Sequence, residues 1–566
     1  MASHTENKPQ GIHLSRRSLL KLGGAAAGTM TLAPFLAACA APPTGETPGT
    51  ESSGTAEPAT AGSDEPRVGG ELIIGSIQEP DSLNPWLTGL TVGQEVEMLI
   101  YESLTRVDPE GNHVPALASE VPSLENGGIS EDLMTYSYTL RDNVTWHDGT
   151  PFTAADVIFT YEAIADPSVN ALSRAGFELI ESAEATDDHT VVFHLNEPSG
   201  VFLETWGYRG ILPKHIFENE DMNTSEYNRA PTVGTGAYKF VQWISGDRIT
   251  LERNENYYRE GGYINTIDYR IVPSSDTLLT MLETGEIDMR FAINVEQVEI
   301  VRGLDEYELF STPAHAYFHF TINNADPILG DKLVRQALTH GLNKRQITET
   351  VLQNLVQPHG SPIAQPSWAY VDHNARFPFD PEQARALLDE AGWTEGSDGV
   401  RTKDGERLSL SLLNIAGDSE RLQIVQLAQA MWAEIGVEVN VEQVDAATFV
   451  AAMTSQNYQF GYGFWGFSVD PSSYNERWLS TSPGQWLNYE NPEVDRLLLD
   501  AMQLIDREER KAKYAKFQDI VVEDATNIWV YNRVYFDAVK DRVHNFVPNT
   551  SNATNMWNAH EWWIEE

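Results

Sequence analysis

A single cysteine, Cys39, limits how this chain of 566 residues can be stabilised. Because one cysteine cannot form an intramolecular disulfide, the body of the protein must gain its stability by burying apolar side chains. A chain of this length can bury enough residues to build more than one domain. The lack of disulfides is therefore no obstacle to folding.

The residues before Cys39 have the features of an export signal. Arg16 and Arg17 precede a modest apolar run from Leu22 to Ala38, which is the arrangement of a twin-arginine signal peptide. Glycines and a proline interrupt this run, so a signal that is removed is favoured over a permanent transmembrane helix. We expect residues 1–38 to be a twin-arginine lipoprotein signal peptide.

Leu36-Ala37-Ala38-Cys39 resembles the lipobox of bacterial lipoproteins. The resemblance implies that the Cys39 sulfur carries a diacylglycerol, whereas the alternative is an unused thiol. Residues 39–67 are rich in Ala, Pro, Thr, Gly, Ser and Glu and predict a disordered tether after the lipidated cysteine. We therefore expect an extracytoplasmic protein anchored to the outer face of the cytoplasmic membrane.

The formal net charge of the chain is −45 at pH 7. Such an acidic chain is a poor partner for nucleic acid, which is itself strongly negative. Solubility in salty or hot surroundings explains the acidity, and binding of cations is the alternative. Charge alone does not identify a ligand.

Beyond Arg67, strand patterns and helix patterns alternate without a repeat, which predicts a mixed α/β body. Period-two patterns predict antiparallel strands, and capping residues with a spacing of three or four predict helices. The expected strands lie at 71–75, 136–140, 238–240, 249–251 and 437–441, and the expected helices follow Asp331, follow Asp380, and end at Gly436.

Several segments resemble the extracellular solute-binding proteins of family 5, which are the dipeptide, oligopeptide and nickel binding proteins of ABC importers. The strongest match is the segment from Leu140 to Val157, which contains Trp146-His147-Asp148-Gly149-Thr150-Pro151-Phe152-Thr153. Further matches are Tyr101 to Pro109, Pro115 to Ala118, Pro213-Lys214-His215, Gly234 to Tyr238, Glu252 to Tyr258, Gly285 to Asp288, Val334 to Leu338 and Ala391-Gly392-Trp393.

The resemblance implies a two-lobed α/β fold like that of periplasmic binding proteins, with a ligand cleft between the lobes and an extra inserted domain. It places the discontinuous domain of lobe I at 68–113, 228–313 and 532–566, the inserted domain at 114–227, and lobe II at 314–531. The implied function is capture of a peptide-like solute by hinge closure and its delivery to a permease. We expect a monomer.

The loop from Tyr462 to Pro471 is the best candidate for the cleft. In peptide binders of the family, the matching loop has a tryptophan followed three residues later by an aspartate that pairs with the α-amino group of the peptide. Here the tryptophan is Trp465 and the later position is Ser468. Asp470 is a possible substitute for the missing carboxylate, and leaving a buried ammonium unpaired costs several kcal/mol as an order of magnitude.

The resemblance leaves the solute class open. Some family members bind oligosaccharides, and an aromatic row can stack on sugar rings. Nickel is also represented in the family, but the histidines show no trusted ligand spacing, and His315 and His319 are expected to be packing residues near Tyr317. The candidate ligand-binding residues are Glu79, Asp81, Ser82, Tyr317, Trp368, Gly463, Phe464, Trp465, Ser468, Asp470 and Trp486.

No enzymatic activity is expected, and no cofactor, metal or catalytic residue is assigned. The segment from Gly466 to Asp470 comes within one residue of a nucleophile elbow but lacks its final glycine. Neither a phosphate-binding GxxxxGK[ST] motif nor HExxH occurs. A secreted hydrolase and an adhesive surface protein stay open as alternatives.

Overall fold

The computed structural model describes residues 65–550 and 555–565. Arg16, Arg17 and Cys39, on which the predicted export signal and lipid anchor depend, lie outside the described residues. Within the described part of the chain, no helix is both long enough and apolar enough to span a bilayer.

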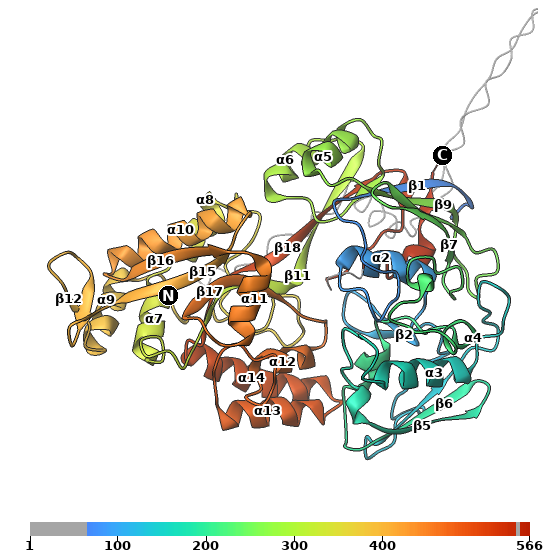
Figure 1. The fold of residues 1–566 in the computed structure, drawn as a ribbon, viewed down its shortest axis with the longest axis horizontal. Helices are drawn as coiled ribbons and strands as arrows, with labels where there is room; N and C mark the ends of the chain where they lie inside the picture. The colour runs from blue at the N-terminus through green and yellow to red at the C-terminus, as the bar shows by residue number, and fades with distance from the viewer. Residues whose placement is uncertain (1–64, 551–554, 566) are drawn as a thin grey trace, which may run out of the picture. The chain divides into compact units, whose positions relative to one another are not determined.

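One mixed sheet of ten strands runs through the body, in the order β16-β15-β17-β11-β18-β10-β1-β9-β8-β7. Its two long strands, β11 (Tyr307–Ile322) and β18 (Asn527–Lys540), pair antiparallel. Figure 1 shows that they pass from one group of elements into the other, which confirms the two-lobed α/β fold. The predicted lobe boundaries at 313/314 and 531/532 fall inside these two strands.

Lobe I forms the end of the sheet where β1 pairs in parallel with β9 and β10. Helix α2 packs on one face of these strands, and α5 and α6 pack on the other. Its strands are β1 (Gly69–Ser76), β7 (Tyr238–Ile244), β8 (Arg248–Arg253), β9 (Ile264–Ile271), β10 (Met289–Arg290), β19 (Val543–His544) and β20 (Trp563–Ile564), and its helices are α2 (Thr91–Ile100), α5 (Ser275–Glu283) and α6 (Val298–Arg302).

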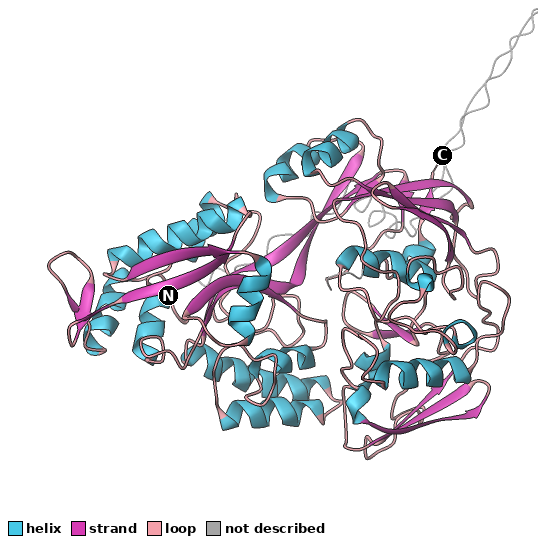
Figure 2. Cartoon of the chain, in the orientation of Figure 1, coloured by secondary structure: helices cyan, strands magenta, loops and turns pink. Residues whose placement is uncertain are grey.

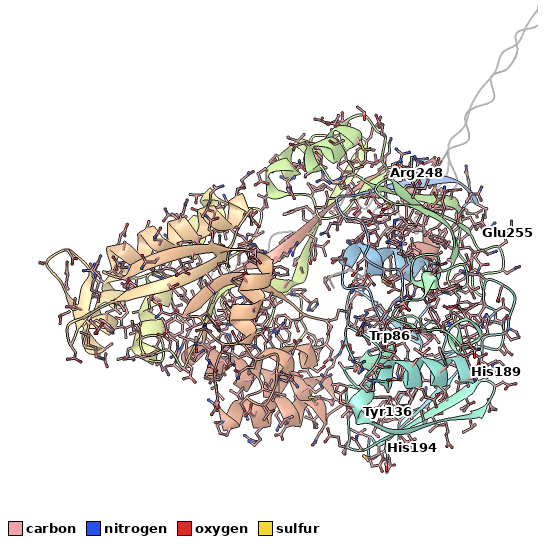
Figure 3. All side chains as sticks on the ribbon, viewed as in Figure 1. Trp86, Tyr136, His189, His194, Arg248 and Glu255 are labelled. Carbon is pink, nitrogen blue, oxygen red and sulfur yellow. The ribbon has the colours of Figure 1, made fainter. Side chains whose placement is uncertain are left out.

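The inserted part has a separate core under a three-stranded antiparallel sheet of order β4-β6-β5. Trp86 and Tyr136, labelled in Figure 3, are buried in this core, although Trp86 comes from the segment before the predicted insertion. The elements are β2 (Thr105–Val107), β3 (His113–Pro115), β4 (Thr135–Thr139), α3 (Ala154–Ala165), β5 (Ile180–Asp187), β6 (Thr190–Leu195) and α4 (Lys214–Phe217).

Lobe II has helices on both faces of its part of the sheet (Figure 2). Helices α7, α9 and α10 pack on one face, and α12, α13 and α14 pack on the other. The helices are α7 (Lys332–His340), α8 (Lys344–Thr350), α9 (Pro381–Glu390), α10 (Ser419–Glu434), α11 (Ala446–Thr454), α12 (Asn475–Trp478), α13 (Pro492–Met502) and α14 (Arg507–Glu523). The strands are β12 (Thr394–Glu395), β13 (Arg401–Lys403), β14 (Glu406–Arg407), β15 (Ser409–Ile415), β16 (Glu438–Val444) and β17 (Phe460–Gly466).

The expected helix ends are confirmed by their capping contacts. The Asp331 carboxylate accepts a hydrogen bond from the Leu333 backbone N–H (3.0 Å), and Asp380 accepts one from Gln383 (2.9 Å). Gly436 ends α10 with a φ of +85°, a left-handed conformation that glycine adopts without strain. The expected antiparallel pairing is also confirmed, for β4 with β6 and for β7 with β8.

The lobes touch at a second place, away from the two long strands. The backbone N–H of Gly200 in the inserted part donates to the carbonyl of Met502 in lobe II (2.7 Å). Arg507, the first residue of α14, donates to the Asn112 side chain (3.2 Å) and to the Gly111 carbonyl. The two lobes are therefore joined both by the long strands and by this second contact.

Candidate functional site

The segment predicted to be a cleft loop, Tyr462 to Pro471, is a strand as far as Gly466, so its first half belongs to β17, which pairs in parallel with β15, the neighbour of β16. The carboxyl ends of parallel strands are where ligands bind in open α/β sheets. Side chains alternate along β17, so that Phe464 is 39% exposed whereas its neighbour Trp465 is 3% exposed. The two rings therefore project from opposite faces of the sheet.

Trp465 belongs to the core of lobe II. It lies opposite Tyr317 of β11, and its ring centroid is 4.2 Å from that of His319 and 6.3 Å from that of Trp486. Trp368 packs against the same core, beside the guanidinium of Arg510, whereas Phe464 projects from the opposite face of the sheet. The four rings proposed to stack on a sugar, those of Trp368, Phe464, Trp465 and Trp486, therefore do not form one row.

Phe464 faces a group of cationic and aromatic side chains that the sequence analysis did not identify. The guanidinium carbons of Arg421 and Arg533 lie 5.7 and 5.2 Å from its ring centroid, and Arg533 also lies 4.7 Å from the ring centroid of Tyr535. We call Arg421, Phe464, Arg533 and Tyr535 the hinge arginine cluster. Of these four residues, Arg533 could have been noticed in the sequence, because it is a cation in the middle of a largely apolar strand.

Asp470 has a cationic partner within lobe II. Its two carboxylate oxygens accept hydrogen bonds from Arg510 at 2.6 and 2.8 Å, and one of them also accepts from the Ser472 N–H (2.8 Å). Burial by itself would raise the pKa of Asp470, but the Arg510 charge and these hydrogen bonds hold the pKa below its ordinary value. This carboxylate is engaged in an ion pair rather than available to a ligand ammonium.

Ser468 is half-buried, and no hydrogen bond within residues 65–550 and 555–565 joins its hydroxyl to a histidine. A nucleophilic serine needs such a base within hydrogen-bond reach. Gly463 pairs with His319 across the sheet, and a Cβ there would sit 3.5 Å from the Phe449 ring.

In the turn after β1, polar side chains form hydrogen bonds within the turn and with β7. Glu79 accepts hydrogen bonds from the Trp243 indole N–H (2.9 Å) and the Gly246 backbone (3.2 Å). Asp81 accepts from the Thr88 hydroxyl (2.6 Å), and Ser82 donates to the Asn228 carbonyl (3.3 Å). All three side chains therefore form hydrogen bonds that hold parts of lobe I together.

His147, within the strongest sequence match, has a structural role. Its Nδ1 accepts a hydrogen bond from the Gly234 N–H (3.1 Å), and its Nε2 donates to the Gly236 carbonyl (3.0 Å). Burial lowers the pKa of His147 to about 4, so the ring is neutral near pH 7. A neutral ring fits these two contacts, because the nitrogen that accepts must be unprotonated.

The described residues contain no group of three or more His, Cys, Asp or Glu side chains that could hold a metal ion. His315 and His319 lie on β11 beside Tyr317 and are buried, as expected for packing residues. Tyr317, a candidate ligand-binding residue from the sequence, is fully buried as well. Burial lowers the pKa of His315 to about 4 and that of His319 to about 3.

The different burial of Phe464 and Trp465 leads to opposite expectations for alanine substitution. Trp465→Ala removes a buried ring and should lower the free energy of unfolding by about 3–5 kcal/mol. Phe464→Ala should change it by less than about 1 kcal/mol, because the ring is partly exposed. Urea unfolding of both variants measures this, and equal losses would contradict the assignment of the two faces.

Asp470→Asn should destabilise the protein by about 3 kcal/mol, because it leaves the buried Arg510 charge without its partner. The folded-state pKa of Asp470 is lowered, so its stabilising contribution is present above the unfolded pKa and is lost as the pH falls through the folded pKa. The difference between wild type and variant should therefore shrink below about pH 4. Removing both charges, in Asp470→Asn with Arg510→Met, should recover part of the loss in chemical denaturation at pH 7.

Comparisons with known proteins agree with this architecture. Over 548 residues the chain is 28% identical to the oligopeptide-binding protein AppA of Bacillus subtilis, covering 94% of this chain and 97% of the relative. The structure of that AppA in complex with a nonapeptide matches 89% of this chain and 100% of its own, with 26% identity and a TM-score of 0.74.

Two further solved structures are similar. The ABC transporter substrate-binding protein CtaP from Listeria monocytogenes is 26% identical with a TM-score of 0.78, covering 88% of this chain and 100% of its own. NikZ from Campylobacter jejuni, in complex with Ni(L-His), is 27% identical with a TM-score of 0.74, covering 87% and 99%.

The family model described as bacterial extracellular solute-binding proteins, family 5 Middle, matches residues 112–486. This match covers more than half of the chain and includes Gly200, one partner of the second contact between the lobes, as well as the loop after β17. The chain therefore belongs to the bacterial extracellular solute-binding proteins of family 5.

Proposed function

We propose that this protein is the substrate-binding subunit of an ABC importer and that it captures a peptide-like solute between its lobes. The observation that carries the proposal is the single sheet shared by both lobes through β11 and β18, together with a second contact between the lobes at Gly200 and Met502. The nonapeptide complex of AppA, a relative along nearly the whole chain, supports a peptide as the solute.

The transport step follows from hinge closure. A solute that touches both lobes stabilises the form in which they approach each other, because its contacts are complete only there. The contacts of Gly200 with Met502 and of Arg507 with Gly111 join the lobes in that form. The closed monomer is then the form that docks on the permease.

An oligosaccharide is the second candidate solute, and the observation that favours it is Ser468. The serine removes the carboxylate that offsets a peptide ammonium in relatives, and Asp470 is already paired with Arg510. The exposed ring of Phe464 gives a sugar one surface on which to stack. A nickel chelate, as bound by NikZ, is a weaker candidate because His315 and His319 are buried.

A thermal-shift screen of residues 68–566 tests the proposed function. The ligands are short peptides, N-acetylated peptides, oligosaccharides and nickel. At a hundredfold excess over the dissociation constant, a true solute should stabilise the protein by about 2.7 kcal/mol. Stabilisation by peptides supports the proposal, whereas stabilisation by oligosaccharides alone would replace it with the second candidate.

We further propose that the protein is exported through the twin-arginine route, is cut before Cys39 and is held to the outer face of the cytoplasmic membrane by lipid on that cysteine. The support is the sequence Leu36-Ala37-Ala38-Cys39 after a twin-arginine segment. Cys39→Ala should move the protein from the membrane fraction to the soluble fraction, as measured by immunoblotting after ultracentrifugation. An unchanged membrane fraction would contradict the anchor.

A further inference from the structure

Arg533 is a half-buried cation that lacks a polar partner in the structure. Within residues 65–550 and 555–565, no hydrogen bond or ion pair reaches its guanidinium, which lies over the rings of Phe464 and Tyr535 and whose charge acts on Glu420 at longer range. A guanidinium carries five N–H donors. Aromatic rings attract its positive charge, but they do not provide oxygen or nitrogen acceptors for those N–H groups. The N–H groups of Arg533 are therefore available for an acceptor that is not part of the chain.

The excess of acidic over basic residues makes it unusual for an arginine to have no carboxylate partner. The chain has 83 acidic and only 38 basic side chains, so a cation can readily be given a carboxylate partner. Arg542 and Arg510, for example, form ion pairs at 2.7 and 2.6 Å with Asp288 and Asp470. Leaving Arg533 without one, at a partly desolvated position, costs free energy that a bound anion would recover.

Carboxylates around the hinge arginine cluster have hydrogen-bond or ion-pair partners other than Arg533. Glu420 accepts a hydrogen bond from the Tyr531 hydroxyl (3.0 Å), and Asp418 pairs with Arg421 (3.1 Å). On the lobe I side, Asp537 accepts from the Ala292 N–H (2.9 Å), and Glu95 accepts from the Tyr269 hydroxyl. None of these four carboxylates is hydrogen-bonded or ion-paired to the Arg533 guanidinium.

We propose that Arg533 binds a carboxylate group of the solute, with the rings of Phe464 and Tyr535 on either side and the Arg421 charge nearby. This inference rests on the proposed function and narrows its substrate class to solutes that carry a carboxylate, such as a peptide with a free carboxyl end. A guanidinium binds a carboxylate through two parallel N–H···O bonds, which fixes orientation as well as adding affinity.

Arg533 lies where the binding of a solute could be coupled to the approach of the two lobes. It lies on β18 between Asn532, which pairs with Tyr317 in lobe II, and Val534, which pairs with Pro313, at the register shift between the long strands. Its ring contacts reach Phe464 of lobe II and Tyr535 farther along the same strand. A carboxylate bound there lies at the crossing from one lobe to the other.

The test uses a random pentapeptide mixture with free carboxyl ends, the same mixture with amidated carboxyl ends, and succinate, measured by thermal shift at physiological ionic strength. The proteins are wild type, Arg533→Gln, Arg533→Lys and, as a matched control, Arg345→Gln at an exposed position of α8. Wild type and the control should bind the free-carboxyl mixture at least tenfold more tightly than the amidated one. Arg533→Gln should lose this preference, and Arg533→Lys should keep part of it.

Three other outcomes separate this inference from the proposed function. If both mixtures bind wild type equally and Arg533→Gln changes neither affinity, peptide binding stands and the carboxylate site is overturned. If no peptide binds but succinate stabilises wild type and not Arg533→Gln, the carboxylate site stands and the peptide assignment fails. If neither peptides nor succinate stabilise wild type, the carboxylate site is overturned. Unchanged melting of ligand-free Arg533→Gln excludes misfolding as the cause of a loss.

Discussion

Pairing between β11 and β18 is the contact on which the rest of the structure depends. These two strands carry the sheet from one lobe into the other, and their register shifts between Pro313 and Tyr317 and between Phe318 and His319. An extra residue on one strand bends a ladder and increases its twist. The crossing between the lobes is therefore part of the hydrogen-bonded sheet, and Arg533 lies on β18 at this crossing.

The strongest sequence match to the family is part of the scaffold. His147 binds the backbone at Gly234 and Gly236, Asp148 pairs with His215 (3.0 Å), and Asp156 accepts a hydrogen bond from the Lys214 backbone (3.1 Å). Three separate sequence matches thus meet at one place in the inserted part. Each of these segments provides a hydrogen-bond partner of another, so they hold the scaffold together and do not identify the solute.

The sequence predicted the fold class, the capped helices and the antiparallel pairs, because capping residues and side-chain periodicity act locally. It predicted the site less well. Trp465 and Phe464 are neighbours in sequence, and only the packing of lobe II decides which ring is buried. Asp470 has a partner forty residues away, Arg510, that no local pattern indicates. Arg533 stands in an apolar strand, but only the structure shows that it has no carboxylate partner.

The second contact between the lobes depends on a glycine. The Gly200 N–H donates to the Met502 carbonyl, and a Cβ on Gly200 would lie 2.0 Å from the Leu504 carbonyl oxygen, which is closer than any side chain tolerates. Because this hydrogen bond, unlike those of Arg507 in the same contact, is made by main-chain atoms, its strength does not depend on which side chains line the solute site. Substitutions of side chains in the solute site can therefore change which solute is bound while the Gly200–Met502 hydrogen bond between the lobes stays the same.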